Sequence, residues 1–184
     1  MSSGVRRTLI RLAGLLIILL AFGAALLPIA HNIPARTVIG LLLVAAGVVE
    51  LGAFAARPKH HIPGGIAAAA TFLAGLRLAL DPSANYFTVL NFVILWLIVR
   101  SAALFVLGLR TARPLCFWAL FAAAVDLILA IALLSGLQIA FLVIGIFGPT
   151  SELLATFAWV FAASFVAAGV FLIGSAPTAR RGDT

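Results

Sequence analysis

The sequence predicts an all-α integral membrane protein in which six transmembrane helices form a single membrane domain over residues 1–184. Composition is the first reason: 65% of the residues are hydrophobic, only 9% are charged, and the mean hydropathy is +1.27. A soluble domain carries about 25% charged residues, so this chain cannot cover itself with a polar surface. The other two reasons are six long apolar stretches and basic residues that fall between them.

Each apolar stretch approaches the about 20 residues that cross a bilayer as a helix. Proline, glycine and polar residues separate the stretches. The predicted spans are residues 12–30, 38–56, 64–80, 87–109, 115–135 and 152–174. The first stretch follows Arg6 and Arg7 as a signal peptide would, but it exceeds the about 7–15 apolar residues of such peptides. We therefore expect an uncleaved first helix.

Basic residues predict the orientation of these helices. Between spans on one side of the membrane only Arg36 occurs. The other side holds Arg6, Arg7, Arg11, Arg57, Lys59, Arg110, Arg113, Arg180 and Arg181. Because loops rich in lysine and arginine stay in the cytoplasm, we expect both termini, with short tails 1–8 and 176–184, on the cytoplasmic side.

The chain also contains an internal repeat. Arg57 and Arg110 each close a span of small and apolar residues, and the two arginines lie 53 positions apart. The sequence therefore predicts three tandem hairpins at about 12–56, 64–109 and 115–174, all starting from the cytoplasm. Residues 137–147 are extra in the third hairpin and too short to span. Three interpretations of that segment stay open: an extension of the fifth helix, an interfacial segment or a re-entrant one.

Two stretches carry a family resemblance: residues 39–51, IGLLLVAAGVVEL, and residues 125–130, VDLILA. The layout over about residues 12–175 resembles the HdeD-type family (domain of unknown function 308) of small bacterial membrane proteins. The resemblance implies a multi-pass protein of the bacterial inner membrane, linked to acid resistance or envelope stress, with no catalytic site to transfer. Two features depart from the pattern, namely the 137–147 segment and Arg100, which stands where the repeat predicts a small residue like Gly47.

Charged residues within the spans are the candidate functional residues. A charge at the bilayer centre costs at least about 2.5–3.5 kcal/mol, so such residues usually pair or line a cavity. From the helical rise, Arg100 and Asp126 lie about 15 Å and 16 Å from the cytoplasmic ends of their helices, and Glu50 lies about 10 Å from its own. We therefore predict a buried ion pair between Arg100 and Asp126, with Glu50 as second partner. Arg77 lies near the outer end of its helix, and we expect it to reach the outer headgroups.

Stripes of small residues predict which helix faces bury these acids, because such stripes let transmembrane helices approach closely. The stripe around Asp126 consists of Ala119, Ala122, Ala123 and Ala130, and the one around Glu50 consists of Gly40, Gly47 and Phe54. Trp96 lies one turn before Arg100. Two orientations stay open for its ring: stacking on the guanidinium or facing lipid.

Several functional classes find no support in the sequence. No catalytic residues are predicted, because neither a nucleophile with a base nor a phosphate-binding loop is present. No metal or cofactor is expected, since His31 and the pair His60 and His61 fall in loops on opposite sides. The net charge of +7 does not indicate nucleic-acid binding, because the basic residues lie at span ends. Cys116 is interpreted as a small packing residue.

Three functional hypotheses follow. The first is a non-enzymatic membrane protein acting in acid tolerance or envelope stress. The second is a small proton- or ion-linked transporter or channel that uses Glu50, Arg100 and Asp126. The third is an accessory subunit of a larger membrane complex, with the bilayer, a second copy or other membrane subunits as partners. A buried Arg–Asp pair can also simply fix helix register, so the sequence leaves the cluster's role open between structure and function.

Overall fold

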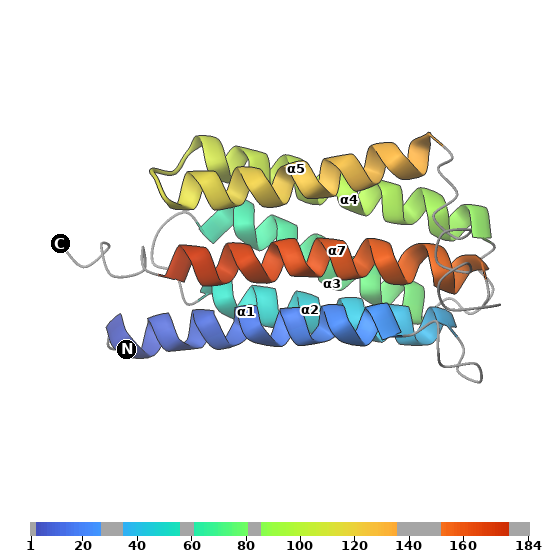
Figure 1. The fold of residues 1–184 in the computed structure, drawn as a ribbon, viewed down its shortest axis with the longest axis horizontal. Coiled ribbons are helices and arrows are strands. Elements are labelled where there is room, and N and C mark those ends of the chain that lie inside the picture. Colours follow the sequence, from blue (N-terminus) through green and yellow to red (C-terminus); the bar gives the residue numbers. More distant parts are fainter. Residues whose placement is uncertain (1–2, 27–34, 56–60, 81–85, 136–151, 177–184) are drawn as a thin grey trace.

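The computed structural model of this chain describes residues 3–26, 35–55, 61–80, 86–135 and 152–176, which form six α-helices. The helices run up and down along one common axis (Figure 1). Their bounds are α1 (Ser3–Leu26), α2 (Ala35–Ala55), α3 (His61–Leu80), α4 (Tyr86–Leu109), α5 (Leu115–Leu134) and α7 (Glu152–Ser175). The all-α prediction and the six predicted helices are therefore confirmed.

Three of these helices are long and apolar enough to cross a membrane, namely Ile62–Leu80, Phe87–Leu109 and Leu115–Leu134. The described parts of α2 and α7 contain shorter apolar segments, Ile39–Ala55 and Trp159–Ser175. From α2 onward the predicted and observed helix ends differ by at most three residues. Helix ends are well predicted here because prolines and polar residues interrupt the apolar stretches at those positions.

Two predictions about helix starts are wrong. Helix α1 begins at Ser3 rather than at residue 12, so most of the predicted tail 1–8 is helical. Arginine is a good helix former, and the Thr8 hydroxyl is accommodated in this turn by donating to the carbonyl of Gly4. Likewise, His61 is the first residue of α3 and not part of a loop. The segment 137–147 and the loop residues His31 and His60 lie outside the described residues.

The helices close into a ring in the order α1, α2, α3, α4, α5, α7, with α7 returning to α1. The start of α1 and the end of α7 lie at the same end of the bundle (Figure 1). Each predicted hairpin does bring two antiparallel helices into contact. The most extensive packing, however, joins α2 to α3, α4 to α5 and α1 to α7. The closest pairs are thus shifted by one helix from the predicted hairpins.

Glycines explain these close pairs. A Cβ atom added to Gly47 of α2 would lie 2.5 Å from the backbone nitrogen of Phe72 in α3. On the other side of the same contact, Gly75 of α3 meets the backbone of Val44. Helices α1 and α7 approach in the same way, because a Cβ at Gly169 would lie 2.7 Å from the carbonyl oxygen of Gly14. Small residues therefore set the distance between helix axes.

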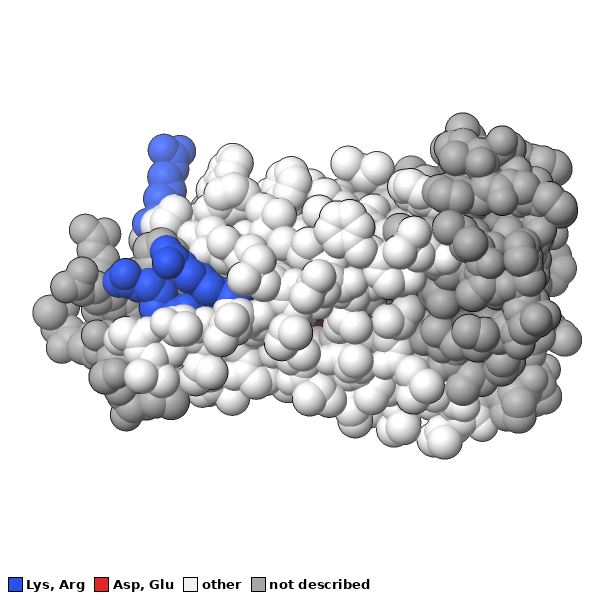
Figure 2. Space-filling model, turned by 60° about the horizontal axis from the view of Figure 1, so that its bottom comes forward, with Lys and Arg blue, Asp and Glu red and all other residues white. Residues whose placement is uncertain are grey.

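The outer surface of the bundle is apolar. Large side chains such as Leu19 of α1, Leu73 of α3 and Ile128 of α5 are 60–64% exposed. On the face drawn in Figure 2, basic side chains gather at the end where α1 begins and α7 ends, and the middle is almost entirely uncharged. Charged side chains lie instead in the interior, where Glu50, Arg100 and Asp126 are all at most 3% exposed.

Candidate functional site

Arg100 is the centre of a buried polar cluster, which we call the arginine cluster and define as Glu50, Arg100, Asp126 and Ser164. Its guanidinium uses both terminal nitrogens to bind two carboxylates. Nη1 donates to Oδ2 of Asp126 on α5 at 2.6 Å, and Nη2 donates to Oε1 of Glu50 on α2 at 2.6 Å. The ion pair predicted from helical depth is therefore present, with Glu50 as its second partner.

Ser164 of α7 completes the cluster. Its hydroxyl accepts a hydrogen bond from Nη1 of Arg100 at 2.8 Å and donates one to Oδ1 of Asp126 at 2.6 Å. One arginine side chain on α4 therefore ties together α2, α5 and α7. This serine is not among the site residues predicted from the sequence, because it carries no charge. A depth comparison could have found it, since Ser164 lies eleven residues before Ser175, about 16 Å along the helix and level with Arg100.

Aromatic and hydroxyl side chains surround the guanidinium. Trp96 is 3% exposed, and its ring centroid lies 5.8 Å from Cζ of Arg100. Its indole Nε1 donates to Oγ1 of Thr71 on α3 at 3.2 Å. Of the two orientations that the sequence left open for Trp96, the structure has the ring beside the guanidinium, and the lipid-facing one is wrong. Trp96 shares the buried face of α4 with Arg100 because the two residues lie one helical turn apart.

A further interhelical hydrogen bond lies near the arginine cluster. The hydroxyl of Ser101 donates to the backbone carbonyl of Ala123 on α5 at 2.9 Å. That carbonyl belongs to the small-residue stripe around Asp126, whose alanines Ala119, Ala122, Ala123 and Ala130 are all buried. The predicted stripe on α2 is buried as well, including Gly40, Gly47 and Phe54. The small residues therefore bring the backbones near enough for the side chains of α4 to reach both neighbours.

The arginine cluster contains an excess of acid. Two carboxylates share one guanidinium, so the cluster carries one net negative charge when all three groups are ionised. Oε2 of Glu50 is buried and has no hydrogen-bond partner among the described residues. Nε of Arg100 is likewise buried and unpartnered there. Because an unpaired charge inside an apolar bundle is costly, Glu50 is the least satisfied member of the cluster.

The predicted internal repeat allows Arg100 to be compared with a glycine. Arg100 occupies the position that Gly47 occupies 53 residues earlier. On α2, Gly47 lets the backbone of α3 approach closely. On α4, the long side chain of Arg100 extends instead into the interior of the helix bundle. The substitution of a small residue by arginine therefore exchanges a tight helix contact for a polar centre.

The remaining candidate residues lie apart from the cluster. Arg77 is exposed in the last turn of α3, at the end of the bundle opposite the termini. Cys116 is partly buried near the start of α5. Within the described ranges, no three side chains of histidine, cysteine, aspartate and glutamate come together in a group that could hold a metal ion.

Replacing Ser164 by alanine tests the cluster's fourth member. The Ser164→Ala variant leaves one oxygen of Asp126 without its donor, and a buried unsatisfied acceptor costs about 1–3 kcal/mol. We expect the free energy of unfolding in mixed micelles to fall by that amount. Ser135→Ala is the control, because Ser135 is exposed and bonds only within its own helix turn at Ala132. An equal loss in both variants would show that Ser164 contributes nothing particular.

Comparison with protein-family models, with curated proteins and with solved structures found no match to this chain.

Proposed function

We propose that this chain is a non-enzymatic protein of the bacterial cytoplasmic membrane, that it spans the bilayer six times, and that both termini are cytoplasmic. One observation carries the proposal: the described helices place large apolar side chains outside and the charged side chains Glu50, Arg100 and Asp126 inside. This distribution suits a lipid solvent, because a charge in hydrocarbon must find its partner within the protein. The three helices that are long and apolar enough to cross a membrane also support it.

Within this membrane protein, the arginine cluster serves as a lock that holds the helices in one register. The support is geometric, since all three charged side chains are at most 3% exposed and the guanidinium bonds to three other helices. A one-turn shift of α4 would move Arg100 by about 5.4 Å and break these hydrogen bonds. Buried polar groups are known to specify register in helical assemblies.

Cysteine labelling tests the topology. The chain has one cysteine, so Cys116→Ala gives a background without thiols. In that background Ala112→Cys and Ser135→Cys each add one exposed thiol, at opposite ends of α5. In intact cells we expect a membrane-impermeant maleimide to label Ser135→Cys, and to label Ala112→Cys only after permeabilisation. Labelling of both thiols in intact cells would contradict the proposed topology.

The proposed physiological role is tolerance of acid or envelope stress. It is supported by the resemblance to the HdeD-type family, and the two stretches that carry the resemblance contain Glu50 and Asp126, both of which bind Arg100. We expect a strain that lacks the protein to survive acid exposure less well, and the intact gene to restore survival. Equal survival of both strains in acid and under envelope stress would contradict this role.

A proton-linked function is the second candidate, and the unpartnered Oε2 of Glu50 favours it. Ionisable side chains inside a membrane domain often mark proton or ion pathways. If the cluster conducts protons, liposomes that contain the intact protein should dissipate an imposed pH gradient faster than liposomes that contain Glu50→Gln. If the cluster is only a lock, both preparations should leak at the rate of protein-free liposomes.

A further inference from the structure

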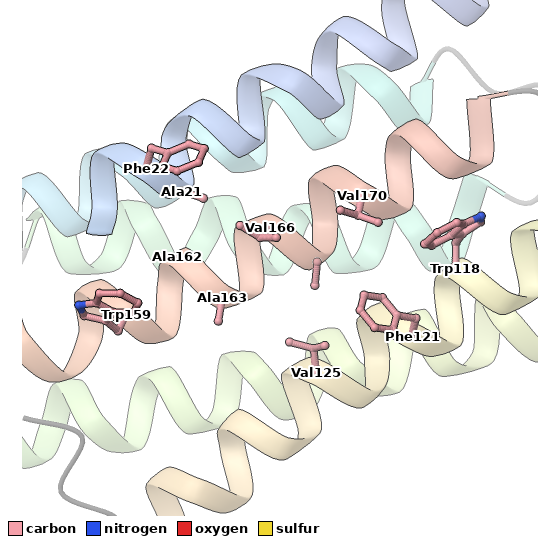
Figure 3. Close-up of a pocket in the computed structure, with 11 residues that line it drawn as sticks. Ala21, Phe22, Trp118, Phe121, Val125, Trp159, Ala162, Ala163, Val166 and Val170 are labelled. Carbon is pink, nitrogen blue, oxygen red and sulfur yellow. The ribbon is translucent and has the colours of Figure 1, made fainter. Parts of the chain in front are cut away.

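Helices α1, α5 and α7 leave an open groove between them with a volume of about 520 Å³. The groove is lined by alanines of α7, such as Ala162 and Ala163, and by Phe22 of α1 and Phe121 of α5 (Figure 3). All the described side chains that line the groove are apolar. The groove is separate from the arginine cluster, since no member of the cluster lines it.

Tryptophans mark the two ends of this groove. Figure 3 places Trp159 at one end and Trp118 at the other, each with its indole nitrogen directed away from the middle. Trp118 packs against Gly174, which lies fifteen residues after Trp159 on α7, so the two rings are about 22 Å apart along the helix. Tryptophan is enriched at both membrane–water interfaces. The groove therefore runs along the membrane normal, within a hydrocarbon core of about 30 Å.

The dimensions of the groove indicate which kind of ligand fits it. A volume of about 520 Å³ spread over about 22 Å gives a channel less than about 8 Å across, whereas a helix with its side chains is about 10–12 Å wide. A single extended hydrocarbon chain fits this shape better than a helix of another protein. Pockets for small apolar ligands have similar volumes, from about 300 to 1,000 Å³.

The charge at one end indicates the headgroup. Arg113 is exposed and lies five residues before Trp118. Because Gly14 of α1 lies opposite Gly169 of α7 in an antiparallel pair, the exposed Arg11 lies near the end of α7, at the same end of the bundle. Figure 2 shows basic side chains gathered at this end. Arginines near a membrane surface attract anionic lipid headgroups.

We propose that this groove is a binding site for one anionic phospholipid. One acyl chain lies along the alanines of α7 between the two tryptophans, and the phosphate group lies at the Trp118 end, within reach of Arg113 and Arg11. The proposal presumes that the chain spans a bilayer, which the cysteine labelling tests independently. Failure of lipid binding with the expected labelling would overturn the site and leave the membrane topology intact.

Native mass spectrometry tests this site on the intact chain. The protein is reconstituted with phosphatidylglycerol or with phosphatidylcholine and transferred to detergent, and the bound lipid is counted. Ala163→Phe fills the groove, while Ala124→Phe makes the same change at an exposed position of α5 outside it. We expect one phosphatidylglycerol per chain in the intact protein and in Ala124→Phe, and at least tenfold less in Ala163→Phe. The double variant Arg11→Gln and Arg113→Gln should lose the preference for phosphatidylglycerol over phosphatidylcholine.

Other outcomes would overturn the proposal. Equal lipid retention by Ala163→Phe and Ala124→Phe excludes the groove as the site, and equal retention of both lipids excludes the anionic headgroup. If the intact protein forms a dimer and Ala163→Phe is a monomer, the groove is occupied by a second copy of the chain and not by lipid. If gel filtration shows that Ala163→Phe does not fold, Val166→Phe replaces it, since Val166 lines the groove and is 42% exposed. Quenching of tryptophan fluorescence by phosphatidylglycerol with brominated acyl chains gives the second readout, and absence of quenching counts against the site.

Discussion

Replacing Arg100 by leucine is expected to lower the free energy of unfolding by about 3–5 kcal/mol, because removal of one partner from a buried ion pair leaves the others uncompensated. Two kinds of interaction are lost in this variant. Glu50 and Asp126 both give up their cation inside the bundle, and Ser164 loses its donor. Since a domain is stable by only about 5–15 kcal/mol, the yield of folded Arg100→Leu should drop sharply. Unfolding in mixed micelles and the monodisperse fraction after gel filtration measure both effects.

Two controls separate lost pairing from lost volume. Arg110→Leu makes the same substitution at an exposed side chain directly after α4, where surface changes usually stay within about 0.5 kcal/mol. The triple variant Arg100→Met, Glu50→Leu and Asp126→Leu removes every charge of the cluster. Apolar replacement of a whole buried ion cluster is often neutral. We therefore expect the triple variant to recover at least half of the unfolding free energy that Arg100→Leu loses. Unchanged stability of Arg100→Leu would contradict the proposal that the arginine cluster holds the helices in one register.

The second large effect is expected for Gly47→Ala, which places a methyl group where α2 meets α3. The added Cβ would lie 2.5 Å from the backbone nitrogen and 2.6 Å from Cα of Phe72. Backbone atoms cannot move aside as a side chain can, so the two helices must separate. Overpacking of this kind costs about 1–3 kcal/mol. The loss should appear as a lower denaturation midpoint in the same mixed-micelle titration.

Gly52→Ala is the matched control, because it lies on the same helix and has nothing within 4 Å of an added Cβ. Alanine is favoured over glycine within a helix by about 0.5–1 kcal/mol, so this variant should be as stable as the intact protein or slightly more stable. The two substitutions are chemically identical and are expected to act with opposite signs. A loss of similar size in both variants would mean that the close α2–α3 contact at Gly47 is not its cause.

The sequence of α4 and of α5 correctly predicted that Arg100 and Asp126 lie at the same level along the bundle. Arg100 and Asp126 lie level because the rise per residue of a helix is fixed at about 1.5 Å, and each helix end is marked by local breakers. The first helix was the exception. Its polar turn with Arg6, Arg7 and Arg11 lies before the apolar stretch, and hydropathy alone does not distinguish the end of a helix from the end of its apolar part.

The sequence by itself determined that the described part of the chain is all-α, where five of the six helices begin and end to within three residues, and at what level along its helix each charge lies. Each of these depends on residues near one another in the chain. Only the tertiary structure decided that α1 packs most closely on α7, that Trp96 turns inward and that Ser164 joins Arg100. The rotation of a helix and the choice of its neighbours depend on side chains far apart in sequence, such as Gly14 and Gly169. Their packing must be solved for the whole bundle at once.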